Sequence, residues 1–324
     1  MNSAPESAGI RALDVLSLGV YCVDILVRPV RQLPPPGGME EVDEYDLQTG
    51  GCANNAAIAM ARLGLRVATL GHVGRDRMGD IVLGDLRANG IDTRYMARDR
   101  DSHTSMSVVL IKESGERSFL HHRGANLKLS AGDVPEGALS TARALQIGGA
   151  FLMPLLDGEP MAQLLRQARQ EGVLTFVDTA VDTHGNRMEV VQAALPHMDY
   201  FLPSEAEATG MTGHSDPQRM AERLLAEGVG AVCIKLGEQG CLVVNRDGAQ
   251  IVPAYQVQPV DTCGAGDTFT GGFVAGILRG LGMAGAAQLA NAVGATCVTG
   301  LGATAALGTW EETLAFMRRT AVRG

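Results

Sequence analysis

The segment Asp261 to Phe273, DTCGAGDTFTGGF, combines a glycine-rich turn with two carboxylates. An apolar run, Phe273 to Leu278, follows and is typical of the first turns of a helix. Such a turn presents unpaired backbone N–H groups and the positive end of the helix dipole to one point, which favours an anion. Where that anion is a phosphoryl group in transfer, Asp267 is placed to accept the proton of an attacking hydroxyl.

A second glycine-led segment, Gly50 to Gly64 (GGCANNAAIAMARLG), is expected to be a turn followed by a helix. Its alanines favour a helix, and its last glycine is a natural end. Gly50 and Gly51 bring the backbone close to a partner, and Asn54 or Asn55 caps the helix. A capped, buried helix that binds nothing explains this motif equally well.

Asp24 and the pair His121 and His122 are further candidates for ligand binding. Asp24 follows a short apolar run, Val15 to Val20, that is expected to be a buried first strand, and ligands of open α/β sheets bind where strands end. A turn aspartate with a local capping role fits the same spacing. The neighbouring His121 and His122 suggest a metal, but adjacent residues on a strand point to opposite faces, which disfavours a metal site.

The bulk composition limits the classes of function. With 324 residues and 46% hydrophobic residues, the chain can build one large α/β domain or two ordinary ones. A net charge of −9 disfavours a nucleic-acid groove, because phosphate-backbone binding needs a basic surface. No stretch has the length of an apolar membrane span, so no membrane partner is expected.

Cysteine usage and the first residues indicate the compartment. The six cysteines are scattered without a CxxC pair, which is typical of buried apolar residues in a reducing environment. The N-terminus, MNSAPESAGIRALD, lacks a cationic head followed by an apolar run and is not expected to be a signal peptide. These features predict a cytoplasmic protein with a short disordered start.

Strand-like and helix-like patterns alternate through most of the chain, which predicts a doubly wound, mainly parallel sheet flanked by helices. Two excursions, 31–49 and 97–123, alternate like hairpins and do not fit that plan, so we expect them to form a small β-sheet lid. The remaining ranges are expected to form an α/β nucleotide- and substrate-binding domain: 12–30, 50–96 and 124–324.

The elements expected within the α/β domain are strands at Val67 to Val73, 173–178, Met198 to Leu202 and Ala231 to Gly237, and helices at 80–89, 161–171, 188–194 and 218–227.

Together, GGCANNAAIAMARLG and DTCGAGDTFTGGF, in this order within an alternating α/β chain, resemble the PfkB or ribokinase-like family of carbohydrate kinases. The resemblance covers the chain from Leu13 to about Leu307. It implies a ribokinase-like α/β fold with a β-sheet lid, and transfer of a phosphoryl group from ATP to a hydroxyl of a sugar or sugar-like substrate.

The resemblance also implies roles for individual residues. Asp267 corresponds to the catalytic base, and the adjoining backbone of Gly264, Ala265 and Gly266 corresponds to the anion hole. The residues implied on the substrate side are Asp24, Gly50, Gly51, Asn55 and Asn126. The residues implied on the nucleotide side are Lys235, Gly237, Gly240, Asn291, Gly302 and Ala303.

The metal positions include one departure from the family pattern. The family's NxxE motif reads SEAE here, so Ser204 stands where asparagine is usual, while Glu207 is kept. We expect Mg²⁺ to be held near Glu207 through water, since Mg²⁺ usually keeps several waters. The resemblance further implies a monovalent cation, K⁺, beside Asp261 and the 299–303 loop. Asp261 is also expected to shape the turn.

The partners expected are therefore a small sugar and ATP, with a homodimer formed through the exposed edge of the lid. Two other functions stay open. A nucleoside kinase of the adenosine type uses the same fold, although aromatic residues make up only 4% of the chain and offer no obvious stacking platform. A non-catalytic sugar- or nucleotide-binding regulator also fits the fold, but it has no need of an intact Asp267 and GAG turn.

Overall fold

The computed structural model of the chain describes residues 11–181, 185 and 187–323. Residues 1–10, which belong to the predicted disordered start, lie outside this range. Among the described helices, none is both long and apolar enough to cross a bilayer.

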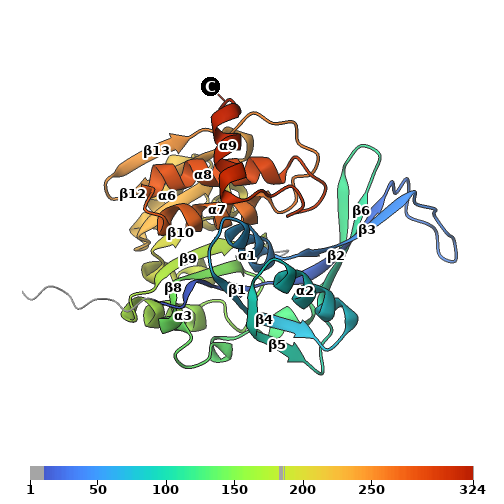
Figure 1. The fold of residues 1–324 in the computed structure, drawn as a ribbon, viewed down its shortest axis with the longest axis horizontal. Helices are drawn as coiled ribbons and strands as arrows, with labels where there is room; N and C mark the ends of the chain where they lie inside the picture. Colours follow the sequence, from blue (N-terminus) through green and yellow to red (C-terminus); the bar gives the residue numbers. More distant parts are fainter. Residues whose placement is uncertain (1–10, 182–184, 186, 324) are drawn as a thin grey trace, which may run out of the picture.

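Within the described residues, nine strands form one large sheet in the order β13-β12-β11-β10-β9-β8-β1-β4-β5 (Figure 1). Neighbours from β5 to β11 pair in parallel, and β12 and β13 extend the sheet as an antiparallel hairpin. The strands are β1 (Leu13–Gly19), β4 (Val67–Gly74), β5 (Asp92–Asp99), β8 (Ala142–Ala150), β9 (Leu174–Thr179), β10 (Tyr200–Phe201), β11 (Ala231–Lys235), β12 (Cys241–Asn245) and β13 (Gly248–Val252).

Helices cover both faces of this sheet, and each layer has its own apolar core. In β1, Leu16 and Leu18 belong to one core, and Val15 belongs to the other. One core includes residues of α3 (Glu159–Gln170), α4 (Met188–Val191), α5 (Glu205–Thr212) and α6 (Pro217–Ala226). The other packs against α1 (Cys52–Arg62), α2 (Arg77–Ala88), α7 (Ala265–Leu278), α8 (Gly282–Cys297) and α9 (Trp310–Arg319). The predicted doubly wound plan is therefore confirmed.

Short 3₁₀ helices occur at η1 (Gly124–Lys128), η2 (Ala131–Asp133), η3 (Leu139–Thr141), η4 (Leu195–His197) and η5 (Gly237–Gln239).

Several predicted element boundaries were wrong. The helix after the glycine-rich turn begins at Ala265 rather than Phe273, because the N–H of Thr268 already bonds to the carbonyl of Gly264 at 2.9 Å. Helix α5 was not predicted; the hydroxyl of Ser204 accepts from the N–H of Glu207 and starts it as a capping box. Two elements are shorter than predicted: α4 ends at Val191, and β10 spans only two residues.

A second sheet of four strands, in the order β3-β2-β6-β7, extends to one side of the body and forms the lid (Figure 1). Its strands are β2 (Cys22–Arg28), β3 (Glu44–Gly50), β6 (Ser105–Ile111) and β7 (Arg117–His122). The predicted division placed 12–30 in the α/β domain, but β2 is a central strand of the lid. Asp24 therefore lies within a lid strand and not at the end of the first strand of the large sheet.

Cross-strand register gives the lid sheet two different faces. One row across the sheet is Gln48, Asp24, Ser107 and His121. The next row, one residue along each strand, is Leu47, Ile25, Val108 and Leu120, which therefore lies on the opposite face. We call the polar side the inner face and the apolar side the outer face.

Candidate active site

The turn from Gly264 to Asp267 caps α7 at the point where the two predicted motifs meet. Gly264 is the N-cap in the left-handed region, with φ 75° and ψ −2°. A Cβ at this position would overlap the side chain of Ala303, so the turn requires glycine both for its conformation and for its packing. The first N–H groups of a helix have no acceptor within the helix and can bind an anion, although the Ala265 N–H also bonds to the carbonyl of Thr262 at 3.4 Å.

Asp267 lies in that first turn and joins the two motifs directly. The side-chain amide of Asn55, from α1, donates to Asp267 Oδ2 at 2.8 Å across a sequence separation of 212 residues. Burial raises the pKa of the Asp267 carboxyl, while the Asn55 amide and the Lys235 ammonium oppose that rise. A carboxylate with a raised pKa is a stronger proton acceptor than an ordinary aspartate.

Asp24 occupies the inner face of the lid close to the same turn. Gly50 lies so close that a Cβ there would overlap the Asp24 carboxylate. Burial raises the pKa of Asp24, and a hydrogen bond from Ser107 opposes the rise. Ser107 in turn lies 3.0 Å from His121 Nδ1, so a carboxylate, a hydroxyl and an imidazole are linked side by side. This chain of polar groups suits a ligand that carries several hydroxyls.

Gly51 and Asn126, which the resemblance assigned to substrate, hold the backbone near Asp24. Gly51 is the N-cap of α1 and lies against the carbonyl of Val20. The Asn126 amide donates to the carbonyl of Tyr21 at 3.0 Å and accepts from the Tyr21 N–H at 3.2 Å. Both residues therefore fix the start of β2, on which Asp24 sits.

A buried ion pair behind the turn was not recognised from the sequence. Lys235 Nζ donates to Asp178 Oδ1 at 2.6 Å, and the two side chains are 12% and 1% exposed. The Thr270 hydroxyl donates to the other Asp178 oxygen at 2.7 Å. Burial raises the pKa of Asp178, and the Lys235 ammonium opposes that rise. Asp178 lies at the end of β9, where the rule applied to Asp24 also predicts ligands.

Glu207 is held by its own helix cap. Its Oε2 accepts from the Thr179 hydroxyl and from the Ser204 N–H, both at 2.7 Å. The Ser204 hydroxyl accepts from the Glu207 N–H, so the serine that replaces the family asparagine is engaged in capping α5. Ser204 and Lys235 are also joined by an isolated β-bridge, which brings Glu207 close to the Lys235 ion pair.

The donor set around Glu207 fits a hydrated magnesium ion. Among the described residues, no group of three or more His, Cys, Asp or Glu side chains forms a metal cage. Mg²⁺ commonly binds through one or two carboxylates, waters and substrate phosphates, so a lone carboxylate beside an anion-binding turn is sufficient. A second carboxylate, Asp178, lies nearby, and the Lys235 ammonium interacts with both Asp178 and Glu207.

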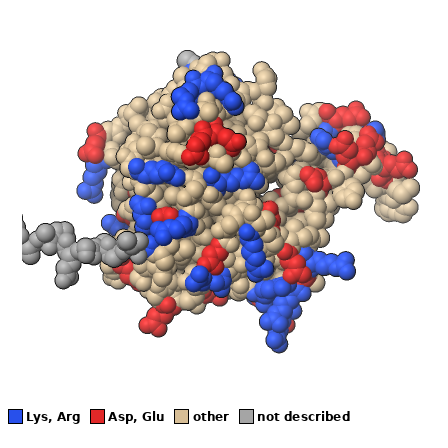
Figure 2. Space-filling view, in the orientation of Figure 1, with Lys and Arg blue, Asp and Glu red and all other residues tan. Residues whose placement is uncertain are grey.

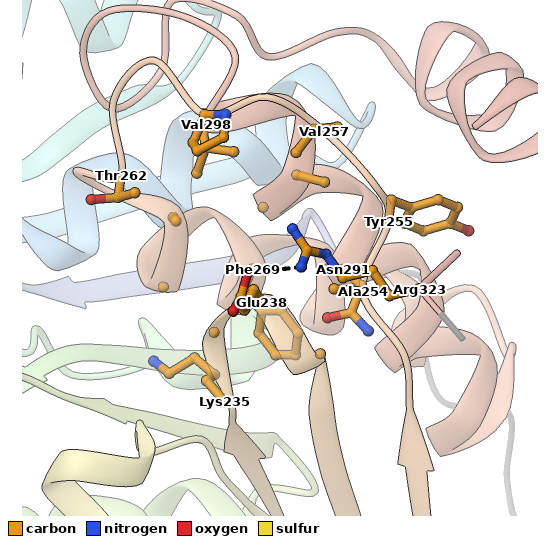
Figure 3. A pocket seen from close by; sticks show the side chains of 17 residues that line it. Lys235, Glu238, Ala254, Tyr255, Val257, Thr262, Phe269, Asn291, Val298 and Arg323 are labelled. Carbon is orange, nitrogen blue, oxygen red and sulfur yellow. Dashed lines mark hydrogen bonds and ion pairs between the residues drawn. The ribbon is translucent and has the colours of Figure 1, made fainter. Parts of the chain in front are cut away.

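A pocket opens beside Lys235 and the 264–267 turn, and Figure 3 shows its lining side chains. We call it the large pocket; its volume is about 1010 Å³ with its open mouth included. Lys235, Gly237, Gly240 and Asn291, which the resemblance assigned to the nucleotide, all line it. The Asn291 amide donates to the carbonyls of Val252 and Pro253, so it also fixes the pocket wall. Near the chain end, Arg323 pairs with Glu238 at 2.7 Å, drawn as a dashed line in Figure 3.

Gly302 and Ala303 lie elsewhere than predicted. They do not line the large pocket but a small cavity under the lid, which we call the lid cavity. Its lining also includes Asp24, Leu26, Gln48, Thr49, Val109, Arg117, Asp261 and Cys263. The 301–303 loop packs against the back of the glycine turn, and this contact between distant segments is not visible in a local motif.

Asp261 shapes the turn, as expected. Its carboxylate accepts from the N–H groups of Cys263 at 2.7 Å and Gly302 at 2.9 Å. The guanidinium of Arg117, from lid strand β7, lies 2.5 Å from the same carboxylate. The Asp261 side chain is fully buried, and its charge is compensated by this arginine.

Known proteins resemble the chain over nearly its whole length. Ribokinase of Haemophilus influenzae is 30% identical over 287 residues, which cover 87% of this chain and 91% of the relative. The 2-dehydro-3-deoxygluconokinase of Bacillus subtilis is 28% identical over 87% of this chain and 90% of its own length.

A solved structure and a family profile agree with these relatives. A putative ribokinase II from E. coli, determined in complex with ATP and Mg²⁺, superposes with a TM-score of 0.82 at 26% identity, covering 95% of this chain and 99% of the other. The profile described as pfkB family carbohydrate kinase matches residues 14–310. With the 264–267 turn, Asn55 and Asp267 in contact beneath a β-sheet lid, the chain belongs to the pfkB family of carbohydrate kinases.

Proposed function

We propose that this kinase transfers the γ-phosphoryl group of ATP to a hydroxyl of a sugar or sugar-like acceptor, with Asp267 as the base. The contact between Asn55 and Asp267 carries the proposal, because it joins the two motifs at the 264–267 turn. On one side of that turn opens the large pocket, and on the other lies the lid cavity. A donor and an acceptor bound there meet at Asp267.

The transfer step needs positioning and charge stabilisation more than covalent chemistry. The N–H groups of Gly264, Ala265 and Gly266 are assigned to the γ-phosphoryl oxygens, and Asp267 takes the proton of the attacking hydroxyl. ATP occupies the large pocket beside Lys235, Gly237 and Gly240. Mg²⁺ held near Glu207, partly through water, supplies the positive charge that neutralises the triphosphate.

The acceptor is assigned to the inner face of the lid. Asp24, Ser107 and His121 offer a carboxylate, a hydroxyl and an imidazole in one linked row, which suits the hydroxyls of a sugar. The relatives named above include a kinase of ribose and a kinase of a sugar acid, so both classes of acceptor are candidates. A nucleoside needs a stacking surface as well, and Phe119, which is 57% exposed and pairs with the cavity-lining Val109, could offer one.

A coupled assay of ADP release tests the proposal. Pentoses, hexoses, sugar acids, polyols and nucleosides are compared, with Asp267→Asn as the blank. We expect acceptor-dependent ADP release for a sugar or sugar acid. A nucleoside as the best acceptor would favour the alternative kinase, and ATP binding without turnover on any acceptor would favour a regulator.

The outer face of the lid is assigned to contact with a second copy. Tyr45, Leu47 and Leu120 are 79%, 41% and 63% exposed, and the register places them on one side with Ile25 and Val108. Large exposed apolar patches mark interaction surfaces, and two identical sheets pair readily. Light scattering should give a dimer mass, and Leu120→Lys should give a monomer.

The surface charge of the protein fits small anionic ligands better than a polyanion. In the view of Figure 2, Lys and Arg lie among Asp and Glu over the body, and acidic side chains gather over the lid. Nucleic acid is therefore not a proposed partner.

A cytoplasmic location is proposed from the cysteines, all six of which are free thiols. A potassium ion beside Asp261 remains a prediction, and Arg117 already contacts that carboxylate.

A further inference from the structure

Asp261 is a buried carboxylate that needs a compensating cation. Its side chain is 0% exposed, and both oxygens are engaged by the backbone of Cys263 and Gly302. Removing a charge from water is costly unless a partner of opposite charge is present. In this structure the partner is Arg117, whose side chain is 18% exposed.

The cation is supplied by the lid. Arg117 is the first residue of β7 and pairs across the hairpin with Ile111, so its position follows that of the lid sheet. A second lid residue, Gln48, reaches the same loop: its amide donates to the carbonyl of Leu301 at 3.4 Å. Gln48 also lies so close to Gly302 that a Cβ there would overlap it. Gln48 therefore brings the lid into contact with both Leu301 and Gly302 of the 301–303 loop.

The Asp261 carboxylate in turn positions the anion-binding turn. It bonds to the N–H of Cys263, immediately before Gly264, and to the N–H of Gly302, beside the Ala303 that packs on Gly264. A change in how Asp261 is compensated will therefore move the backbone donors assigned to the γ-phosphoryl group. Such donors lose effect when displaced by a fraction of an ångström.

We propose that Arg117 is the built-in cation of this site: with the lid closed, its guanidinium occupies the place beside Asp261 that the family resemblance gives to a monovalent ion. A monovalent cation and the guanidinium then compete for that carboxylate. Turnover is then independent of K⁺, and closing the lid brings the positive charge that compensates the Asp261 carboxylate. Arg117 is a positioning residue, and the inference rests on the proposed kinase function.

The test is Arg117→Met, which removes the positive charge and keeps a long, unbranched side chain. Wild-type kcat should be the same within twofold in K⁺ and in tetramethylammonium. In tetramethylammonium the variant should lose kcat by about 100-fold, as expected when reacting groups are misplaced. Adding K⁺ or free guanidinium should raise the kcat of the variant at least tenfold.

The matched control is Arg28→Met. Arg28 is another arginine on a lid strand, but it pairs with the exposed Glu44 at 2.6 Å rather than with Asp261. Its replacement should leave the response to K⁺ unchanged. Arg117→Lys should retain partial K⁺ independence, because an ammonium still supplies the charge.

A thermal-melting series gives a readout that needs no acceptor. K⁺ should raise the Tm of Arg117→Met but not of the wild type or of Arg117→Met/Asp261→Asn, since a ligand that binds only the native state stabilises it. K⁺ activation of the wild type, or a variant that keeps wild-type kcat and Tm in every salt, would overturn the inference. If the wild type shows no kinase activity but K⁺ still raises the Tm of Arg117→Met, that result would count against the proposed function alone.

Discussion

The large pocket and the lid cavity share one glycine turn but are built from different kinds of elements. Thr262, Ala265 and Gly266 line the large pocket, while Asp261 and Cys263, from the same turn, line the lid cavity. The rest of the large pocket comes from the C-terminal part of the chain, from Lys235 onward. The lid cavity is assembled from β2, β3, β6 and β7 and the 301–303 loop. The nucleotide side is therefore part of the body, and the acceptor side depends on the lid.

Of the changes that compare the two regions, the largest effect is expected from Gly264 in the shared turn. Gly264→Ala should lower kcat by 100-fold or more, because a Cβ there overlaps Ala303 and displaces the donors assigned to the transferred group. Gly280→Ala is the matched control: its φ is 78°, yet nothing lies within 4 Å of the added Cβ. Steady-state kinetics with both substrates checks this. Equal losses of kcat in Gly264→Ala and Gly280→Ala would show that overlap with Ala303 is not the cause.

A change on the lid side should separate the two regions. Asp24→Asn is expected to lower kcat/KM for the acceptor by about 10- to 100-fold, because the site then loses a charge-assisted hydrogen bond to a hydroxyl. The Kd of ATP should stay within threefold, since Asp24 lines the lid cavity and not the large pocket. Calorimetric ATP titration and acceptor kinetics test both halves. A large change in ATP affinity would contradict the separation.

The pH profile should report the buried base. Burial raises the pKa of Asp267 above its ordinary value of 3.8. The ionised form accepts the proton, so kcat/KM for the acceptor should fall as pH falls through the raised pKa, by about tenfold per unit below it. Because the folded-state pKa is raised, the charged carboxylate destabilises the fold at neutral pH, and that cost is relieved as pH falls. A profile flat down to the ordinary value would contradict the burial argument.

The smallest effect is expected on the nucleotide side. Ala295 lies on α8 and lines the large pocket away from the lid. Ala295→Leu should raise the KM for ATP by about tenfold, since extra methylenes in a filled pocket are worth one or two kcal/mol. The KM for the acceptor and kcat should change little. A loss of acceptor affinity instead would show that the two regions are not separable.

Sequence patterns were sufficient for the parts of the site that lie in local motifs. The glycine turn, Asp267 and Asn55 could be named because each belongs to a short motif that resembles the family. The predicted cap at Asn54 or Asn55 was wrong, since Gly51 is the N-cap of α1 and no side chain bonds there. The sheet alternation likewise predicted the fold. Two motifs brought together by α1 and α7 therefore gave the centre of the site.

The parts that were missed depend on contacts between distant segments. Asp178 and Lys235 are 57 residues apart, and nothing near either residue indicates the other. Arg117 was placed on a hairpin, but its contact with Asp261 requires the position of the lid over the 301–303 loop. The wrong placement of Asp24 has a local cause: β1 ends at Gly19 and β2 begins at Cys22, so one apolar pattern runs into two sheets.

The most direct measurement of the central claim is turnover and ATP binding in Asp267→Asn. Removing the base should lower kcat by a factor of 10² to 10⁴, the range typical of general-base catalysis. The Kd of ATP with Mg²⁺ should remain within threefold of the wild type, and the Tm at neutral pH should not fall, because a buried charge has been removed. A variant that turns over its acceptor at the wild-type rate would contradict the assignment of Asp267 as the base.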